Sequence, residues 1–574
     1  MQFSIPAALC LWLLAAPAFS ASADSTENPD ISPLNSVNGE TQEETPSYSA
    51  STLYALMVAE MAGQRQLFDV ALGNYLLEAH RTQDPGVAAR ATQIAQYIGA
   101  DQAALDAATL WSKLDEQNPK AHHAVSLELI KAQRFSEAAL HLQSALSLDE
   151  SLPVDFVSLQ GTHLSPGSRE QWINALTPAL QLFPKHPSLL FNLASLYQQQ
   201  KDIPRALSIL EQVIELQEGF YPAWNLKARL HASNKELDLA LETTNSALKE
   251  FEDDKAFVIL KARLLIKKKE IKAARAIFKQ LTEDYPADAH IWLPLALTQL
   301  ELGELDAAEV SLRELLRQGK MTNEAHFYLG RIEQKNGNHD VALEHYLAMQ
   351  GGREYLAAQN HILQIHVHKE QFEDALTHVQ NQRTIDPDNS QAYFLMEVEL
   401  LNRTKQFDKS MEVLNQALGA YADNTDLRYS RAMVSEKLGD LSQLEADLNY
   451  IIDKEPQNAT ALNALGYTLA DRTPRLDEAL QLIKQARNLQ PEDPAIIDSL
   501  GWVYYRMGRL QEAVQLLREA FKLFPDPEVA AHLGEVLWQM GQKQEARDIW
   551  QQGLNKKPTS AIIKSTMERL IDEK

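Results

Sequence analysis

Cysteine and basic residues are both scarce in this sequence of 574 residues. The single cysteine, Cys10, cannot form an intramolecular disulfide, and one thiol excludes metal sites built from paired cysteines. Lysine and arginine number 54 against 78 aspartates and glutamates, which gives a formal net charge of −24. Surfaces that bind nucleic acids or anionic membranes need clustered cations to neutralise phosphates, so we expect no nucleic-acid partner and no membrane footprint of that kind.

The sequence also lacks the short motifs of common enzymes. It has no glycine-rich phosphate loop, no His-Glu-x-x-His zinc motif and no Gly-x-Ser-x-Gly nucleophile elbow. Its densest group of titratable side chains is His361, His366 and His368. Only His361 and His368 would share a helical face, about 10.5 Å apart, which is too far for one metal ion. We therefore expect helix-surface histidines, no metal site, no cofactor and no enzymatic activity.

The N-terminus combines an apolar run with small residues. The run from Ile5 to Phe19 is shorter than the about 20 residues that a membrane-spanning helix needs, and it is typical of a signal peptide. We predict a signal peptide over 1–23, although no lysine or arginine precedes Arg65. Most of the apolar run follows Cys10, so the sequence does not support a lipid anchor on that residue and leaves membrane attachment open.

Residues 24–50 are rich in Ser, Thr, Asn, Glu and Pro and carry only Ile31, Leu34 and Val37 as aliphatic anchors. Such a segment cannot bury enough apolar area to offset the entropy lost on ordering, so we predict a disordered acidic linker. A plain spacer is one interpretation of this linker, and a partner-binding motif is the alternative.

An internal repeat of 34 residues organises the chain from residue 51 to 560, a span of 510 residues or 15 units. In the clearest copy, Pro494 to Pro525, two runs of apolar residues spaced by three and four flank a turn at Gly508. Small side chains let the two helices of each unit cross closely, so we expect stacked helical hairpins. The apolar segment over 561–574 is expected to form a helix that caps the last hairpin. A small residue returns every 34 positions, or 68 where one copy is skipped, at Ala104, Ala138, Ala206, Ala240, Ala274, Ala308 and Ala342.

Two segments depart from the repeat. The larger runs over 152–184, where glycines and prolines interrupt the pattern and Trp172 stands at the place of the small crossing residue. We expect this bulky side chain to wedge its hairpin apart, and a bend, a binding notch and a decayed repeat all stay open as interpretations. The second departure is Gly351-Gly352, which predicts the end of a helix and a shift of the repeat by one residue.

The repeat resembles the tetratricopeptide repeat (TPR). The resemblance implies an all-α solenoid of helical hairpins, wound as a right-handed superhelix of roughly 12–15 repeats. It also implies that the first helix of each hairpin lines a groove in which a partner binds. The TPR signature is matched in the clearest copy at Ile497, Leu500, Gly501, Tyr504, Ala513, Leu517, Ala520 and Pro525.

Aromatic and arginine side chains at the implied groove positions are the candidate partner-binding residues. Trp, Tyr and Arg dominate protein–protein hot spots because they bury a large area and keep a polar group. The alternative is that these aromatic side chains pack between hairpins. The candidates are Trp502, Tyr505, Arg506 and Trp538, with Phe191, Phe327 and Arg331 as weaker ones.

A closer resemblance is carried by the segments 68–75, 83–104, 463–471 and 530–538. They look like the pseudomonad-type TPR lipoprotein that partners a periplasmic carboxyl-terminal processing protease. This resemblance implies a non-enzymatic adaptor, periplasmic or associated with the outer membrane, that binds the protease and presents peptidoglycan hydrolases to it. The alternative function is a TPR scaffold subunit of an envelope export or polysaccharide-secretion assembly.

Overall fold

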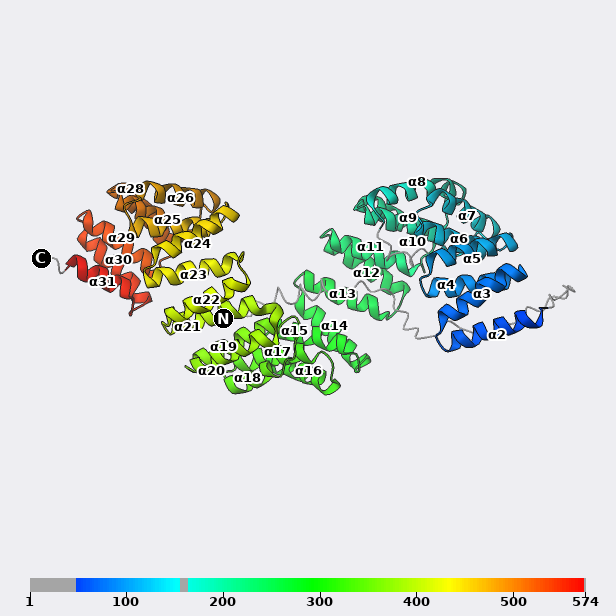
Figure 1. Cartoon of the computed structure of the whole chain (residues 1–574), viewed down its shortest axis with the longest axis horizontal. Coiled ribbons are helices and arrows are strands. Elements are labelled where there is room, and N and C mark those ends of the chain that lie inside the picture. The colour runs from blue at the N-terminus through cyan, green and yellow to red at the C-terminus, as the bar shows by residue number, and fades with distance from the viewer. Residues whose placement is uncertain (1–47, 155–163, 572–574) are drawn as a thin grey trace. The chain divides into compact units, whose positions relative to one another are not determined.

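The computed structural model describes residues 48–154 and 164–571 (Figure 1). In these two ranges the chain forms 30 α-helices and one short 3-10 helix, with no strand. The structure confirms the predicted all-α fold. The predicted signal peptide over 1–23, and nearly all of the predicted linker over 24–50, lie outside the described residues.

The chain divides into two compact units, residues 1–325 and 326–574, and the division falls inside helix α17 (Thr322–Lys335). In the described part of the first unit, seven hairpins and the additional helix α8 pack in succession (Figure 1). Its helices are α2 (Ala50–Gln64), α3 (Phe68–Thr82), α4 (Pro85–Tyr97), α5 (Asp101–Leu114), α6 (Pro119–Lys131), α7 (Phe135–Leu148), α8 (Pro166–Leu182), α9 (Pro187–Gln199), α10 (Ile203–Leu216), α11 (Tyr221–Ser233), α12 (Leu237–Glu250), α13 (Lys255–Lys267), α14 (Ile271–Asp284), α15 (Ala289–Glu301) and α16 (Leu305–Gln318).

The second unit continues the series of hairpins and ends with a single helix. Each hairpin again packs on the next one, in chain order. After α17 the helices are α18 (His339–Leu347), α19 (Tyr355–His368), α20 (Phe372–Ile385), η2 (Pro387–Asn389), α21 (Ser390–Arg403), α22 (Phe407–Ala420), α23 (Thr425–Leu438), α24 (Leu441–Lys454), α25 (Ala459–Arg472), α26 (Leu476–Leu489), α27 (Pro494–Arg506), α28 (Leu510–Leu523), α29 (Pro527–Gln539), α30 (Lys543–Lys556) and α31 (Ala561–Ile571).

Local sequence sets where the helices begin and end. At the start of α27 the Asp493 side chain accepts hydrogen bonds from the backbone N–H groups of Ala495 and Ile496, and Pro494 occupies the first turn. These groups would otherwise lack partners at a helix N-terminus. The following turn contains Gly508 with a φ of 78°, a left-handed conformation that costs glycine little. Residues within this one repeat therefore determine where its first helix begins and where its turn lies.

The small residues of the repeat lie where helices cross. All seven alanines of the 34-residue series, from Ala104 to Ala342, are fully buried. The predicted interruption is also confirmed, because Gly351 and Gly352 have positive φ values and follow α18, which has only nine residues. The spacing of alanines in the sequence thus predicted the packing positions correctly.

The irregular segment over 152–184 is described only in part, because residues 155–163 lie outside the described ranges. Trp172 on α8 is buried and its ring lies 5.8 Å from that of Phe135 on α7. Residues 155–163, which precede α8 in the chain, lie outside the described residues, so the wedge stays a prediction. A surface depression between α7 and α8, lined by Arg134, Glu137 and Asn174 among others, lies where a binding notch was one interpretation.

The last helix, α31, packs on the final hairpin. Ile563 and Leu570 are buried in the core that α31 shares with α29 and α30. A solenoid needs such a cap because its terminal repeat otherwise exposes an apolar face. In the ranges that the structure describes, no helix is both long and apolar enough to span a bilayer.

Candidate protein-binding surface

The predicted partner-binding residues near the C-terminus lie on two first helices, α27 and α29, which pack in series with the preceding first helix α25. These helices contact one another directly from one hairpin to the next, and α29 also contacts α31. Their side chains can therefore meet although about 30 residues separate them in the sequence. We call the acidic, aromatic and basic side chains that meet on these helices the first-helix row: Tyr467, Asp471, Asp498, Trp502, Tyr505, Arg506, Glu528, His532 and Glu535.

Trp502 lies inside this row and is only 7% exposed. Its indole ring stacks on the imidazole of His532 at a centroid distance of 4.2 Å, and its Nε1–H donates to the Asp471 carboxylate at 3.3 Å. The expected exposure of Trp502 is thus corrected, because the ring fills the space between two neighbouring hairpins. Whether Trp502 contributes to partner binding stays a prediction.

The buried centre of the row is the pair of His532 and Asp498, whose Nδ1 and Oδ2 atoms lie 2.8 Å apart. Burial alone would lower the pKa of His532, but the carboxylates of Asp498, Glu528 and Glu535 outweigh burial and raise that pKa. The other carboxylate oxygen of Asp498 is buried without a hydrogen-bond partner. Three carboxylates therefore surround His532, and protonation of its imidazole neutralises part of their negative charge.

Tyr505 and Arg506 lie at the edge of the same row. The hydroxyl of half-buried Tyr505 donates to Glu535 at 2.9 Å, and Arg569 on α31 pairs with the same carboxylate. Burial first, and then Glu535, raise the pKa of Tyr505. Arg506 is exposed and donates to the backbone carbonyl of Asp471. Among Trp502, Tyr505 and Arg506, only Arg506 has the exposure that was expected.

Trp538 follows in the next hairpin and is half-buried. Its ring lies 5.7 Å from that of Trp550 on α30, which is fully buried. Two cations, Lys543 and Arg547, lie over the Trp538 ring at 4.9 and 5.2 Å from its centroid. This side chain therefore packs on its own hairpin and leaves part of its surface to solvent.

The weaker candidates are mostly buried. Phe191 is 6% exposed and its ring packs 5.4 Å from that of Phe220 in the next hairpin. Phe327 is equally buried against Tyr346, and the Arg331 guanidinium lies over the Phe327 ring at 5.8 Å. Burial of Phe191 and Phe327 corrects their expected exposure, because both rings fill gaps between hairpins. Their role in binding, and that of Arg331, stays a prediction.

One histidine of α19, His361, needs a similar correction, whereas His368 is exposed as expected. His361 is not a surface residue, because its ring stacks on Tyr346 at 5.2 Å with the two planes nearly parallel. Burial, with a smaller effect of Arg331, lowers the pKa of His361 to about 4. No group of three or more metal-ligating side chains occurs in the described parts of the chain. His361 is therefore a neutral packing residue near neutral pH.

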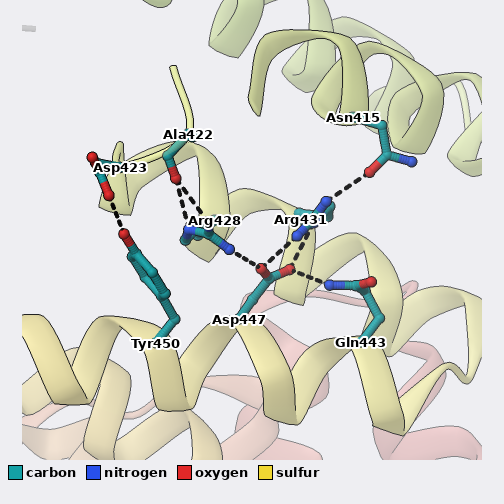
Figure 2. A network of polar contacts seen from close by, with 8 residues as sticks. All are labelled: Asn415, Ala422, Asp423, Arg428, Arg431, Gln443, Asp447 and Tyr450. Atoms are coloured by element: carbon teal, nitrogen blue, oxygen red, sulfur yellow. Dashed lines mark hydrogen bonds and ion pairs between the residues drawn. The ribbon is translucent and has the colours of Figure 1, made fainter. Parts of the chain in front are cut away.

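Sequence inspection missed an ion-pair network in the second unit, which is centred on Asp447 (Figure 2). This carboxylate on α24 is fully buried between two arginines of α23. Arg431 donates to both oxygens at 2.7 Å, Arg428 to one at 3.2 Å, and Gln443 to the other at 3.0 Å. Arg428 also lies over the ring of Tyr450 at 3.7 Å. The only signal in the sequence was a carboxylate 16 and 19 residues after two arginines.

The repeats themselves match known family models. Models of the tetratricopeptide repeat match residues 173–230, 198–264, 231–293, 293–360, 437–494, 474–531 and 504–570, which together cover more than half of the chain. The chain belongs to the tetratricopeptide repeat family. The TPR assignment agrees with the buried alanines and the stacked hairpins described above.

A curated relative shares this organisation over most of its length. The TPR repeat-containing protein PA4667 of Pseudomonas aeruginosa is 38% identical over 493 residues, which cover 86% of this chain and 83% of that protein. The human protein O-mannosyl-transferase TMTC1 is 23% identical over 176 residues, which cover 30% of this chain and 20% of that protein. The second likeness is thus confined to less than a third of this chain.

Solved TPR structures show weaker overall similarity. A TPR protein of Thermus thermophilus, TTC0263, has a TM-score of 0.30 and 20% identity, and the match covers 32% of this chain and 98% of that one. A chain of the APC/C hetero-tetramer Cut9-Hcn1 has a TM-score of 0.35 and 13% identity, with 91% and 97% covered. At these scores the likenesses carry no argument about function.

The TPR family assignment indicates a non-catalytic repeat protein that acts through protein–protein interaction. A TPR solenoid presents many side chains on successive first helices to a partner. A fold alone does not identify that partner, which has to be inferred from particular side chains. The first-helix row combines aromatic side chains with both signs of charge.

Proposed function

We propose that this TPR protein is a non-enzymatic adaptor of the cell envelope. It acts in the periplasm or at the outer membrane, binds a carboxyl-terminal processing protease, and presents cell-wall hydrolases to it as substrates. The proposal combines the sequence resemblance to the pseudomonad-type adaptor with the predicted signal peptide over 1–23. The high identity to a Pseudomonas aeruginosa TPR protein over most of both chains supports it.

The structural observation behind the proposal is the first-helix row on α25, α27 and α29. Its buried members hold three hairpins in register, while Arg506 and Glu528 remain exposed at its edge. A partner segment that docks here meets fixed aromatic and charged groups, so little side-chain entropy is lost on binding. This arrangement suits recognition of protein partners and contains no arrangement of groups that we can assign to catalysis.

An affinity capture with the mature full-length chain as bait tests the proposal. We expect envelope extracts to yield a carboxyl-terminal processing protease together with at least one peptidoglycan hydrolase. The purified bait, added to that protease, should accelerate degradation of the captured hydrolase. Retention of neither a protease nor a hydrolase would overturn the proposal, and capture of export or polysaccharide-secretion components would favour the scaffold alternative.

Two surface variants locate the binding site on the same bait. Arg506→Ala and Glu528→Gln change exposed groups of the first-helix row without opening its buried centre. We expect either variant to weaken capture about 30-fold, the effect of losing a hot-spot contact of about 2 kcal/mol. Arg403→Ala is the matched control, because Arg403 is an exposed arginine on α21 whose ion pair in the described residues is with Glu399 of the same helix.

A further inference from the structure

The first helix of the described chain, α2, presents an uncovered apolar face. Leu53, Tyr54, Met57 and Met61 are between 51% and 72% exposed. At 3.6 residues per turn, these four positions fall within about 100° of the helix circumference and so form one face. The single charged residue of α2, Glu60, is bonded to side chains of α3 and α4. The exposed face of α2 is therefore apolar and uncharged.

The same positions of the repeat are buried in an interior hairpin. Tyr54, Met57 and Met61 each have a counterpart on α27 that lies 442 residues later, which is 13 repeats of 34. The counterparts, all at most 4% exposed, are Ile496, Ser499 and Val503. The preceding hairpin, α25 with α26, packs on α27 and shares a core with it. In the described residues, α2 has no preceding hairpin that could cover its face.

The two ends of the described chain differ in this respect. A repeat array needs terminal units with a polar outer side, because the apolar face of the last unit is otherwise left in water. At the C-terminal end α31 meets this need, since its exposed residues include Lys564, Ser565 and Glu568. At the other end α2 does not, so an apolar segment is required to cover it.

The size of the face limits what can cover it. The exposed parts of its four side chains amount to roughly 500 Å², at about 200 Å² for a large apolar side chain. A patch of this size on a monomer is often functional. A stable dimer buries about 800 Å² on each partner, so this face alone is too small to hold a second copy of the chain. A short tethered segment needs much less area.

The sequence just before α2 contains such a segment. Residues 24–47, which lie outside the described residues, are polar and acidic except for the aliphatic side chains Ile31, Leu34 and Val37. The 11 residues between Val37 and the helix cap Ser49 can span up to about 36 Å, whereas α2 is about 22 Å long. Such a tether holds the aliphatic side chains at a millimolar effective concentration near the face.

We propose that residues 31–37 of the chain dock on the apolar face of α2 and form the N-terminal cap of the solenoid. Ile31, Leu34 and Val37 take the place of the preceding hairpin and withdraw the face from water. The hydrophobic gain offsets the entropy lost by ordering this short segment. This contact is separate from the first-helix row and does not depend on the proposed adaptor function.

Disulfide trapping tests the proposal. The chain from residue 24 onward contains no cysteine, so a pair of introduced thiols reports one contact. Leu34→Cys combined with Met57→Cys should form an intramolecular disulfide under mild oxidation, identified by peptide mass spectrometry. Adding Ile31→Ser and Val37→Ser keeps the tether and removes two anchors, and should slow this reaction at least about 10-fold. Equal rates, or no disulfide, would overturn the proposal.

Two further variants identify the occupant. Leu34→Cys with Leu140→Cys, at an exposed apolar residue of α7, is the matched control and should not cross-link within the chain. Reaction there as fast as at residue 57 would reduce the contact to random collision and overturn the docking. Met57→Cys alone should stay monomeric at micromolar concentration. Rapid formation of a disulfide-linked dimer would assign the face to a second copy and overturn the proposed cap.

Hydrogen exchange provides a readout without introduced thiols. Replacing Ile31, Leu34 and Val37 by serine should accelerate exchange of the α2 amides and leave α27 unchanged, because α27 lies far along the repeat array. Unchanged exchange in α2 would contradict the cap.

Discussion

His532 shows how a single residue of the repeat acquires a special environment from its neighbours. It is buried between the Asp498 carboxylate and the Trp502 indole, which both come from the preceding hairpin, and Tyr467 comes from the one before that. A buried charge is tolerable only when it is paired and hydrogen-bonded. The stability of this cluster therefore depends on the protonation of His532.

The pH dependence of the second unit follows from this pair. The pKa of His532 is raised above the ordinary 6.5, so the folded state binds the proton more tightly than the unfolded chain. This contribution to stability is fully present below about pH 6.5 and is lost as the pH rises through the folded-state pKa. We expect the melting temperature of the C-terminal hairpins to fall over that range, and Asp498→Asn to flatten the profile.

Thermal unfolding followed from about pH 6.5 to about pH 9 measures this effect. The range avoids interference from His361, whose lowered pKa of about 4 makes its contribution disappear only as the pH falls below 6.5. The groups that face His532 are Asp498, Glu528, Glu535 and Tyr467. An Asp498→Asn variant with an unchanged pH profile would contradict the assignment.

At the scale of the element, the hairpin depends on close approach of its two helices. Gly534 on α29 lies against the indole of Trp550 on α30, so that a Cβ atom at residue 534 would overlap the ring. The same repeat position is Gly501 on α27, where a Cβ would lie 2.7 Å from Leu517. Glycine at this position is needed for the helix–helix distance and not for a turn.

We expect Gly534→Ala to lower the free energy of unfolding of the last hairpins by about 1–3 kcal/mol, because overpacking forces the helices apart. Urea denaturation followed by tryptophan fluorescence measures this change. Gly419→Ala on α22 is the matched control, since nothing lies within 4 Å of its new Cβ. That variant should gain about 0.5–1 kcal/mol from helix propensity alone. Equal effects of the two variants would contradict the packing argument.

At the scale of the whole molecule, the order of contacts is nearly one-dimensional. Each helix packs mainly on the helices just before and after it and on the corresponding helix of the next hairpin. In such an array, stability is approximately a sum of repeat terms and nearest-neighbour interfaces. A destabilising substitution should therefore weaken its own hairpin and the adjacent ones, and should leave distant hairpins protected from hydrogen exchange.

Removal of the Asp447 carboxylate tests this locality. Asp447→Ala leaves Arg428 and Arg431 without their shared partner, and we expect a local loss of about 3 kcal/mol. Hydrogen exchange should accelerate in α23, α24 and the adjoining helices, while residues 48–325 keep their protection. Glu399→Gln, which breaks the exposed pair with Arg403, should cost less than about 0.5 kcal/mol. Uniform acceleration over the whole chain would contradict a one-dimensional array.

The sequence by itself determined the hairpins and their crossing points. The residues that define a hairpin act within one repeat, so they recur at a regular spacing in the sequence. Examples are the helix cap Asp493, the turn residue Gly508 and the crossing alanine Ala308. The TPR family and the capping helix at the C-terminus could be predicted for the same reason. The predicted signal peptide and adaptor function rest on the sequence alone and stay predictions.

Only the tertiary structure decided which side chains are buried and which pairs meet. Trp502 and Phe191 were expected in an exposed groove, yet partners from neighbouring hairpins, about 30 residues away, cover them. The Asp447 network arises across a turn, between residues that are 16 to 19 apart. Helix periodicity depends on residues within one helix, so the sequence by itself determined it. Burial and pairing depend on contacts between helices, so only the tertiary structure decided them.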